Sequence, residues 1–384
     1  MDGVPPVRGA CLHGRMEQDA KLRAETRAVW ATVVCFVVGA VAGMAVLGGE
    51  SRPLTGEGAL AMPAAVVAGV IAAGALLTST LMHRRRETAS MPRWQAVVSD
   101  LSTGALTIAF GAVTVMGVLL AAEVLAAGLQ GLRLAAVGGG ILTGVAAAVG
   151  GRFAFGAGAD LRTSDLAALL FGFLVIGTLF AMVTAADPRW WERNFSQLGV
   201  GWAFNGTLVV AGLLVVTVGS YIGRDLHRLL GDAALSRIAV VVALWAAAGI
   251  ALAAVGLLPL HRAPVPHDIA AFGALVLFAA AAATTGATVP AHPRALSITS
   301  IGVGLLVVIA VVLWVPFGLY STTAVEAIVV GLGLLWMATL VRVLAILVPP
   351  GSRPSGQPQL MRALAESGHH AESGSFRADR PESA

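Results

Sequence analysis

Residues 101–127, LSTGALTIAFGAVTVMGVLLAAEVLAA, carry one ionisable side chain, Glu123, in a run long enough to cross a bilayer. A helix needs roughly 20 apolar residues to span the hydrocarbon core. Nine similar stretches lie before and after this one, so apolar sequence dominates the chain from residue 28 to residue 347. The chain is therefore predicted to be a polytopic integral membrane protein.

The composition of the whole chain agrees with this interpretation. Hydrophobic residues make up 57% and charged residues 12%, and the mean hydropathy is +0.83. Soluble domains carry about 25% charged residues. Backbone polar groups must be paired in lipid, which leaves helices or closed barrels, and barrel strands are shorter and alternate. The sequence thus predicts an all-α transmembrane helical bundle, with spans at residues 28–47, 60–82, 101–127, 132–155, 166–186, 198–222, 238–260, 269–287, 298–319 and 324–347.

The distribution of basic residues predicts which helix ends face the cytoplasm. If the N-terminus is cytoplasmic, 20 of the 25 Lys and Arg residues lie in inner segments and 5 lie in outer ones. Cytoplasmic loops carry an excess of Lys and Arg. We therefore expect both termini to be cytoplasmic in a multi-pass protein of the cell membrane. The Ala- and Arg-rich composition suggests a bacterial plasma membrane.

A polar interruption at residues 156–165, GAGADLRTSD, divides the hydrophobic sequence into two parts. Four spans precede it and six follow. We expect a cytoplasmic tail at 1–27, a four-helix transmembrane block at 28–157, a six-helix block at 158–348 and a disordered cytoplasmic tail at 349–384. The last segment is rich in Pro, Gly, Ser and charge, a composition that buries too little apolar surface to fold.

The charge and cysteine content argue against several functional classes. The net charge of +4 follows from the membrane topology, and no basic stripe with interleaved aromatic residues indicates nucleic-acid binding. Cys11 and Cys35 lie in a tail and a span, so they provide neither a disulfide framework nor a cysteine-based metal site. No phosphate-binding GxxxxGKS/T motif occurs. We expect no metal, no cofactor and no nucleic-acid partner.

Polar residues of chemical interest gather on the predicted outer face. The sequence 186–208, ADPRWWERNFSQLGVGWAFNGTL, joins the fifth and sixth spans, and further polar residues open the eighth and tenth. Because an unpaired polar group is costly in apolar surroundings, we expect a shared hydrogen-bonded cluster, walled by Trp191 and Trp202. The alternative is that each side chain separately faces interfacial water. The expected members are Trp191, Asn194, Ser196, Asn205, His267 and Glu326.

Several of these residues stand in short motifs, namely WERNFSQLG at 191–199, Phe204-Asn205, His267 with Ala270-Ala271, and Glu326. This pattern resembles the bacterial domain-of-unknown-function 998 family, which is related to the DRAM/Frag/Sfk group of six-helix membrane proteins. The resemblance covers residues 160–348 and leaves out the four N-terminal spans. It implies work with membrane lipids, such as lipid-anchor remodelling or lipid asymmetry, and brings no catalytic mechanism.

Three functions fit these features. We expect a non-enzymatic membrane protein whose extracytoplasmic polar cap contacts membrane lipid headgroups or a partner membrane protein. The first alternative is a transporter of a small solute or lipid, although the middle of the spans carries almost no charge for ion coupling. The second is an intramembrane lipid hydrolase using Ser196, His267 and Asp268, for which the sequence shows only fragments of a catalytic set.

Overall fold

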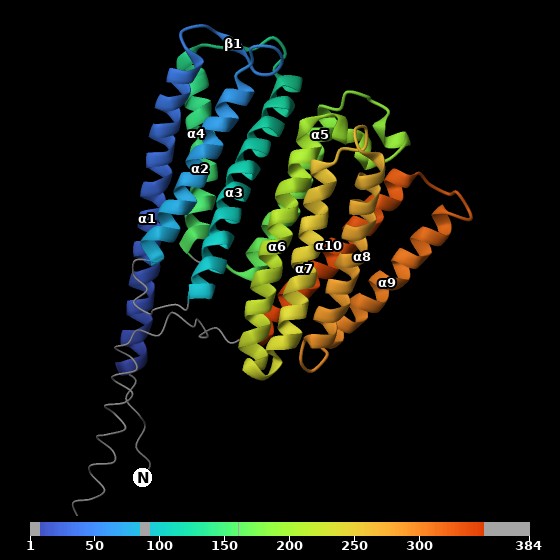
Figure 1. The fold of residues 1–384 in the computed structure, drawn as a ribbon. Coiled ribbons are helices and arrows are strands. Elements are labelled where there is room, and N and C mark those ends of the chain that lie inside the picture. Colours follow the sequence, from blue (N-terminus) through green and yellow to red (C-terminus); the bar gives the residue numbers. More distant parts are fainter. Residues whose placement is uncertain (1–7, 85–92, 160, 349–384) are drawn as a thin grey trace, which may run out of the picture.

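The computed structural model describes residues 8–84, 93–159 and 161–348, which form a bundle of helices (Figure 1). In this part of the chain ten helices are long and apolar enough to cross a membrane, which confirms the predicted all-α, multi-pass architecture. The predicted tail at 349–384 lies outside the described residues. The helices are α1 (Arg8–Leu47), α2 (Ala61–Arg84), α3 (Arg93–Gly128), α4 (Ala136–Ala159), α5 (Thr163–Val183), α6 (Trp202–Leu230), α7 (Leu235–Leu257), α8 (Pro264–Thr288), α9 (Arg294–Trp314) and α10 (Thr322–Leu347).

The helix starts differ from those expected by one to eight residues, apart from the larger difference at α1, and two of the differences change how the connecting segments are described. Helix α1 begins at Arg8, so the segment predicted as a tail at 1–27 enters the helix well before its apolar part, Leu22–Leu47. Helix α6 begins at Trp202 rather than at residue 198, because a 3-10 helix, η2 (Phe195–Val200), and an extended Gly201 precede it. The expected outer loop is therefore longer, and the sixth span begins later along the chain.

Helices α1 to α4 pack as one group, in which α4 lies against α1 and α2, and α3 lies against α2. Glycines make the close approach of α4 to α1 possible. A Cβ atom at Gly144 would meet the carbonyl oxygen of Phe36 at 2.8 Å, which is closer than real Cβ atoms come. Small residues at such crossings let membrane helices gain van der Waals contact. The strands β1 (Arg52–Pro53) and β2 (Arg133–Leu134) pair antiparallel and join the two loops at one end of the group.

Helices α5 to α10 form a second group, in which α6 packs on α5 and α7, α7 packs on α8, and α10 packs on α5 and α9. The α6–α7 crossing depends on glycine. A Cβ atom at Gly249 would lie 2.5 Å from the carbonyl oxygen of Gly212, and one at Gly219 would overlap the Trp245 side chain. Figure 1 shows α9 leaning away from α8, and its main neighbour is α10.

Aromatic rings tie the second group together in its interior. The Trp245 ring meets Phe278 edge-on at 5.3 Å between centroids, and Phe278 meets Trp336 at 6.5 Å. Each indole N–H donates a hydrogen bond, from Trp245 to Thr285 Oγ1 at 3.0 Å and from Trp336 to Ser300 Oγ at 2.9 Å. Buried indoles need such partners. These contacts link α7, α8, α9 and α10.

The two groups stand side by side, and α3 of the first lies against α5 and α6 of the second (Figure 1). Buried side chains of both groups, such as Met116 and Phe180, belong to one continuous hydrophobic cluster. The first group thus packs against α5 and α6 of the second. The loops that join α5 to α6 and α7 to α8 lie together at one end of the second group.

We expect cysteine labelling in intact cells to establish the orientation. In a background with Cys11 and Cys35 replaced by serine, single cysteines at Glu57, Gln130 and His261 should react with an impermeant maleimide. These positions occupy loops that the basic-residue distribution places outside, and all three residues are exposed in the structure.

Cysteines at Asp232 and Arg237, which are also exposed, should react only after the cells are lysed. Labelling of Asp232→Cys in intact cells would show that the orientation is the opposite of the expected one. Below, "outer" and "inner" refer to the expected orientation.

Candidate functional site

The segment between α5 and α6 lies across the outer end of the second group. It contains the 3-10 helices η1 (Trp190–Glu192) and η2, which are separated by Arg193 and Asn194. The rings of Trp190 and Phe195 pack against each other at 5.4 Å between centroids. This contact closes the short turn between the two 3-10 helices, so the residues that follow it along η2 have a defined place above the helix ends.

The side chain of Glu326 binds the backbone of this segment. The Phe195 N–H donates to Glu326 Oε2 at 2.7 Å, although 131 residues separate the two in the sequence. Glu326 is half-buried near the outer start of α10, where Ser321 caps the helix by accepting the N–H of Ala324. A hydrogen bond from an N–H to a carboxylate is stronger than one between two neutral groups. One residue of the outer segment is therefore fixed to α10.

The next residue binds α8. His267 is 3% exposed in the first turn of α8, and its two ring nitrogens both have partners. Nδ1 lies 2.8 Å from the carbonyl oxygen of Leu258, and Nε2 lies 2.9 Å from Ser196 Oγ. A carbonyl oxygen can only accept, so Nδ1 carries a proton. In the neutral ring Nε2 is then an acceptor, and the Ser196 hydroxyl donates to it.

Phe195 and Ser196 together form what we call the outer clasp, because these two adjacent residues join α10 to α8. The clasp bonds are the Phe195 N–H to Glu326 and the Ser196 hydroxyl to His267. Glu326 also lies within electrostatic range of the His267 ring. Three of the residues expected in a shared cluster, namely Ser196, His267 and Glu326, thus lie at one place.

Comparison with known families finds a match in the part of the chain that contains the clasp. Residues 166–343 fit the family model described as "Protein of unknown function (DUF998)". The matched region, residues 166–343, is a DUF998 domain. The match runs from α5 to α10, contains the whole outer clasp, and leaves out α1 to α4. No curated protein and no solved structure matched the chain.

The two asparagines expected in the cluster are not partners in the clasp bonds. Asn205 is in the first turn of α6, where its Nδ2 donates to the carbonyl oxygens of Gly199 at 2.8 Å and Gly201 at 3.3 Å. It therefore holds the local turn instead of meeting His267. Asn194 precedes η2, and its Oδ1 is enclosed with no hydrogen-bond partner among the described residues.

The two tryptophans expected to wall the cluster are mostly exposed. Trp191 is 54% exposed and Trp202 is 52% exposed. The Trp202 ring lies 6.0 Å from that of Phe180, and Trp190, which was not among the expected members of the cluster, packs against the clasp instead. Indole rings at helix ends are typical of the membrane–water interface. At the outer end of the DUF998 unit, the Ser196 and His267 side chains thus face each other, whereas the Trp191 and Trp202 rings are exposed.

A polar network at the inner end of the DUF998 unit was not anticipated. Asp225 is 7% exposed on α6 and accepts a hydrogen bond from the Thr163 hydroxyl at the start of α5. Its Oδ1 lies 3.6 Å from Arg224 Nε and 3.6 Å from Arg228 Nη1. The guanidinium of Arg224 also lies over the Tyr221 ring at 4.1 Å. The sequence signal was available for one of the two pairs, since Asp225 lies three positions before Arg228 on a helix, a spacing that favours pairing.

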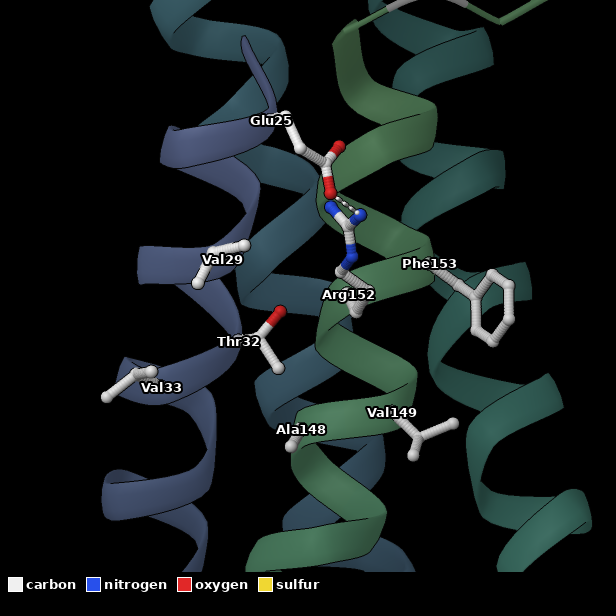
Figure 2. Close-up of a pocket in the computed structure, with 8 residues that line it drawn as sticks. All are labelled: Glu25, Val29, Thr32, Val33, Ala148, Val149, Arg152 and Phe153. Carbon is white, nitrogen blue, oxygen red and sulfur yellow. Dashed lines mark hydrogen bonds and ion pairs between the residues drawn. The ribbon is translucent and has the colours of Figure 1, made fainter. Parts of the chain in front are cut away.

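Outside the DUF998 unit, a shallow groove of about 370 Å³ lies between α1 and α4 (Figure 2). Arg152 Nη2 donates to Glu25 Oε1 at 2.6 Å at the inner end of the groove, and both side chains remain partly exposed. Apolar side chains such as Val29 and Val149 line the rest. Exposed ion pairs contribute about 0–1 kcal/mol, so this pair contributes little to the packing of α1 on α4. Among the described residues, no three His, Cys, Asp or Glu side chains gather as metal ligands.

Proposed function

We propose that this protein is a multi-pass protein of the bacterial cell membrane whose outer cap contacts lipid headgroups. The cap consists of residues 187–202 together with His267 and Glu326. What supports this function best is the opposite orientation of its polar and aromatic groups. The clasp directs Ser196 and the Phe195 N–H inward to His267 and Glu326, whereas the Trp191 and Trp202 rings are more than half exposed.

This arrangement is suited to the headgroup layer for physical reasons. An indole ring has an apolar body and one N–H donor, so it is most stable where acyl chains meet carbonyls and water. Glu192 and Arg193 are exposed beside Trp191 and offer charges of both signs to headgroups. The clasp keeps the segment from moving away, so the ordering cost of lipid contact is already met within the protein.

Fluorescence quenching in nanodiscs tests the proposal. With phospholipids brominated near the glycerol end of the chain, we expect strong quenching of tryptophan emission. The quenched part of the emission should fall sharply in the Trp191→Phe/Trp202→Phe variant, because these two rings are the exposed ones on the cap.

Trp245→Phe is the matched control. Trp245 is fully buried where α7 packs on α6 and α8, so its loss should leave the quenched part unchanged. If the double variant quenches as strongly as the wild type, the cap does not lie in the headgroup layer. A partner membrane protein covering the two rings would then become the better explanation.

A further inference from the structure

We propose that Ser196 and His267 form an acyl-transfer site in which the Ser196 hydroxyl attacks an ester carbonyl of a membrane lipid. This inference rests on the proposed contact of the cap with lipid and goes beyond it by assigning a reaction. The sequence favoured a non-enzymatic role because it offered only scattered residues. In the structure, the serine and the histidine are in direct hydrogen-bond contact.

The geometry is that of an activated nucleophile. A serine is a weak nucleophile unless a base accepts its proton, and the base must itself be oriented by a third group. Here Ser196 Oγ lies 2.9 Å from His267 Nε2, and the Leu258 carbonyl holds Nδ1–H at 2.8 Å. The third group is a backbone carbonyl rather than the expected Asp268, which is exposed to solvent.

The carbonyl of Leu258 fixes the tautomer that the reaction needs. With the proton on Nδ1, only Nε2 has a free lone pair, and that nitrogen faces the serine. His267 is 3% exposed, which keeps water from competing for this lone pair. Low dielectric around the ring also strengthens the hydrogen bond from the hydroxyl.

Ser196 is placed where an ester could reach it. It is half-buried, whereas its base is buried, so the hydroxyl is the more accessible member of the pair. It lies in η2, just before the outer start of α6. Ester carbonyls of phospholipids occupy the interfacial layer that borders the hydrocarbon core. Their depth corresponds to that of the helix ends, where the exposed rings of Trp191 and Trp202 also lie.

The reaction balances without any further reagent than water or a lipid hydroxyl. Ser196 Oγ forms a bond to the ester carbonyl carbon while its proton passes to His267 Nε2. The bond from that carbon to the alkoxy oxygen breaks, and His267 returns the proton to the leaving alcohol. Water or a second hydroxyl then attacks the acyl carbon of the acyl-serine and passes its proton to Nε2. The bond from that carbon to Ser196 Oγ breaks, His267 returns the proton to Oγ, and a free fatty acid or a new ester leaves.

The same hydrogen bond would also be expected if Ser196 merely held the loop to α8. The two roles differ in one respect, since only a nucleophile becomes covalently modified. Purified full-length protein in detergent should be incubated with a fluorophosphonate probe and the labelled peptide identified by mass spectrometry. We expect the label on Ser196, and its absence from Ser196→Ala.

His267→Gln separates catalysis from structure. Glutamine can keep a hydrogen bond with Ser196 but cannot act as a base, so the labelling rate should fall by about 100-fold or more, the range of general-base contributions. The matched control is His261→Ala, an exposed histidine of the loop just before α8, which should label at the wild-type rate. Elution of each variant as a single peak in gel filtration shows that it is folded.

Two results would overturn the inference, namely a folded wild-type protein that does not label, and a His267→Gln variant that labels as fast as wild type. The lipid substrate is tested separately with vesicles of phosphatidylethanolamine and phosphatidylglycerol carrying a fluorescent acyl chain. Release or transfer of that chain supports the substrate class, and labelling without turnover rules it out. Because the probe is water-soluble, labelling does not depend on lipid contact, so the quenching experiment can fail or succeed independently.

Discussion

Replacing Gly249 by leucine is expected to disrupt the core of the six-helix group. Gly249 faces Gly212 where α6 crosses α7, and a Cβ atom there would lie 2.5 Å from the Gly212 carbonyl oxygen and 2.9 Å from the Val216 nitrogen. Both neighbours are backbone atoms that cannot rotate away. Overpacking costs about 1–3 kcal/mol even where side chains can adjust, so we expect a loss of about 3 kcal/mol or more.

The measurement is SDS-induced unfolding in mixed micelles, followed by far-ultraviolet circular dichroism. Gly273→Leu is the matched control, since nothing lies within 4 Å of a Cβ atom at that position on α8. Helix propensity favours leucine over glycine, so this variant should unfold at the wild-type SDS concentration or slightly above it. Equal stability of the two variants would mean that α6 and α7 are not as close as the structure has them.

Asp225→Ala is expected to have the second large effect. The carboxylate accepts from the Thr163 hydroxyl and lies between Arg224 and Arg228, while almost fully buried itself. Its removal leaves cationic groups of α6 without their counter-charge and the start of α5 without its partner on α6. Breaking a buried ion pair on one side costs about 3–5 kcal/mol, and the partial exposure of Arg224 reduces this to about 2–4 kcal/mol.

Asp232→Ala is the comparison for this variant. Asp232 also meets a basic side chain, with Oδ1 2.8 Å from His227 Nε2, but its side chain is 88% exposed. Exposed pairs contribute below about 1 kcal/mol, so this variant should unfold almost as the wild type does. A loss for Asp225→Ala no greater than that for Asp232→Ala would show that the inner network does not hold α5 on α6.

The membrane architecture could be predicted from the sequence because it depends on composition over long windows. The ten spans can be identified even when their ends are wrong by several residues, as the later start of α6 illustrates. The match to the DUF998 family was also predictable, and the motifs from which it was expected, such as WERNFSQLG, lie within the matched residues 166–343. Both depend on the order of residues along the chain alone.

The arrangement of the candidate site was predictable only in part. Polarity on one membrane face indicated Ser196, His267 and Glu326, which do lie together, but it could not separate them from Asn205, which bonds its own turn. The decisive partners are the Phe195 N–H and the Leu258 carbonyl. Every residue has these backbone groups, so no residue type marks the positions at which they are used.

Trp191 and Trp202 illustrate a second limit. Their expected role was to enclose the polar cluster, yet both rings are exposed, and Trp190 packs on the clasp instead. Adjacent tryptophans have the same hydropathy and the same propensity for the interface. Which of the two faces inward depends on the turn between η1 and η2. That turn is held by the bond from the Phe195 N–H to Glu326.

The outer clasp also has a consequence for the order of assembly. Phe195 and Ser196 are synthesised before either of the helices they bind, and their partners lie 131 and 71 residues further along the chain. Contacts between such distant residues form late, because the intervening chain must first be ordered. We therefore expect the segment after α5 to bind α8 and α10 only after both helices have entered the membrane. The bond from the Phe195 N–H to Glu326 can form only when α10, the last helix, is in place.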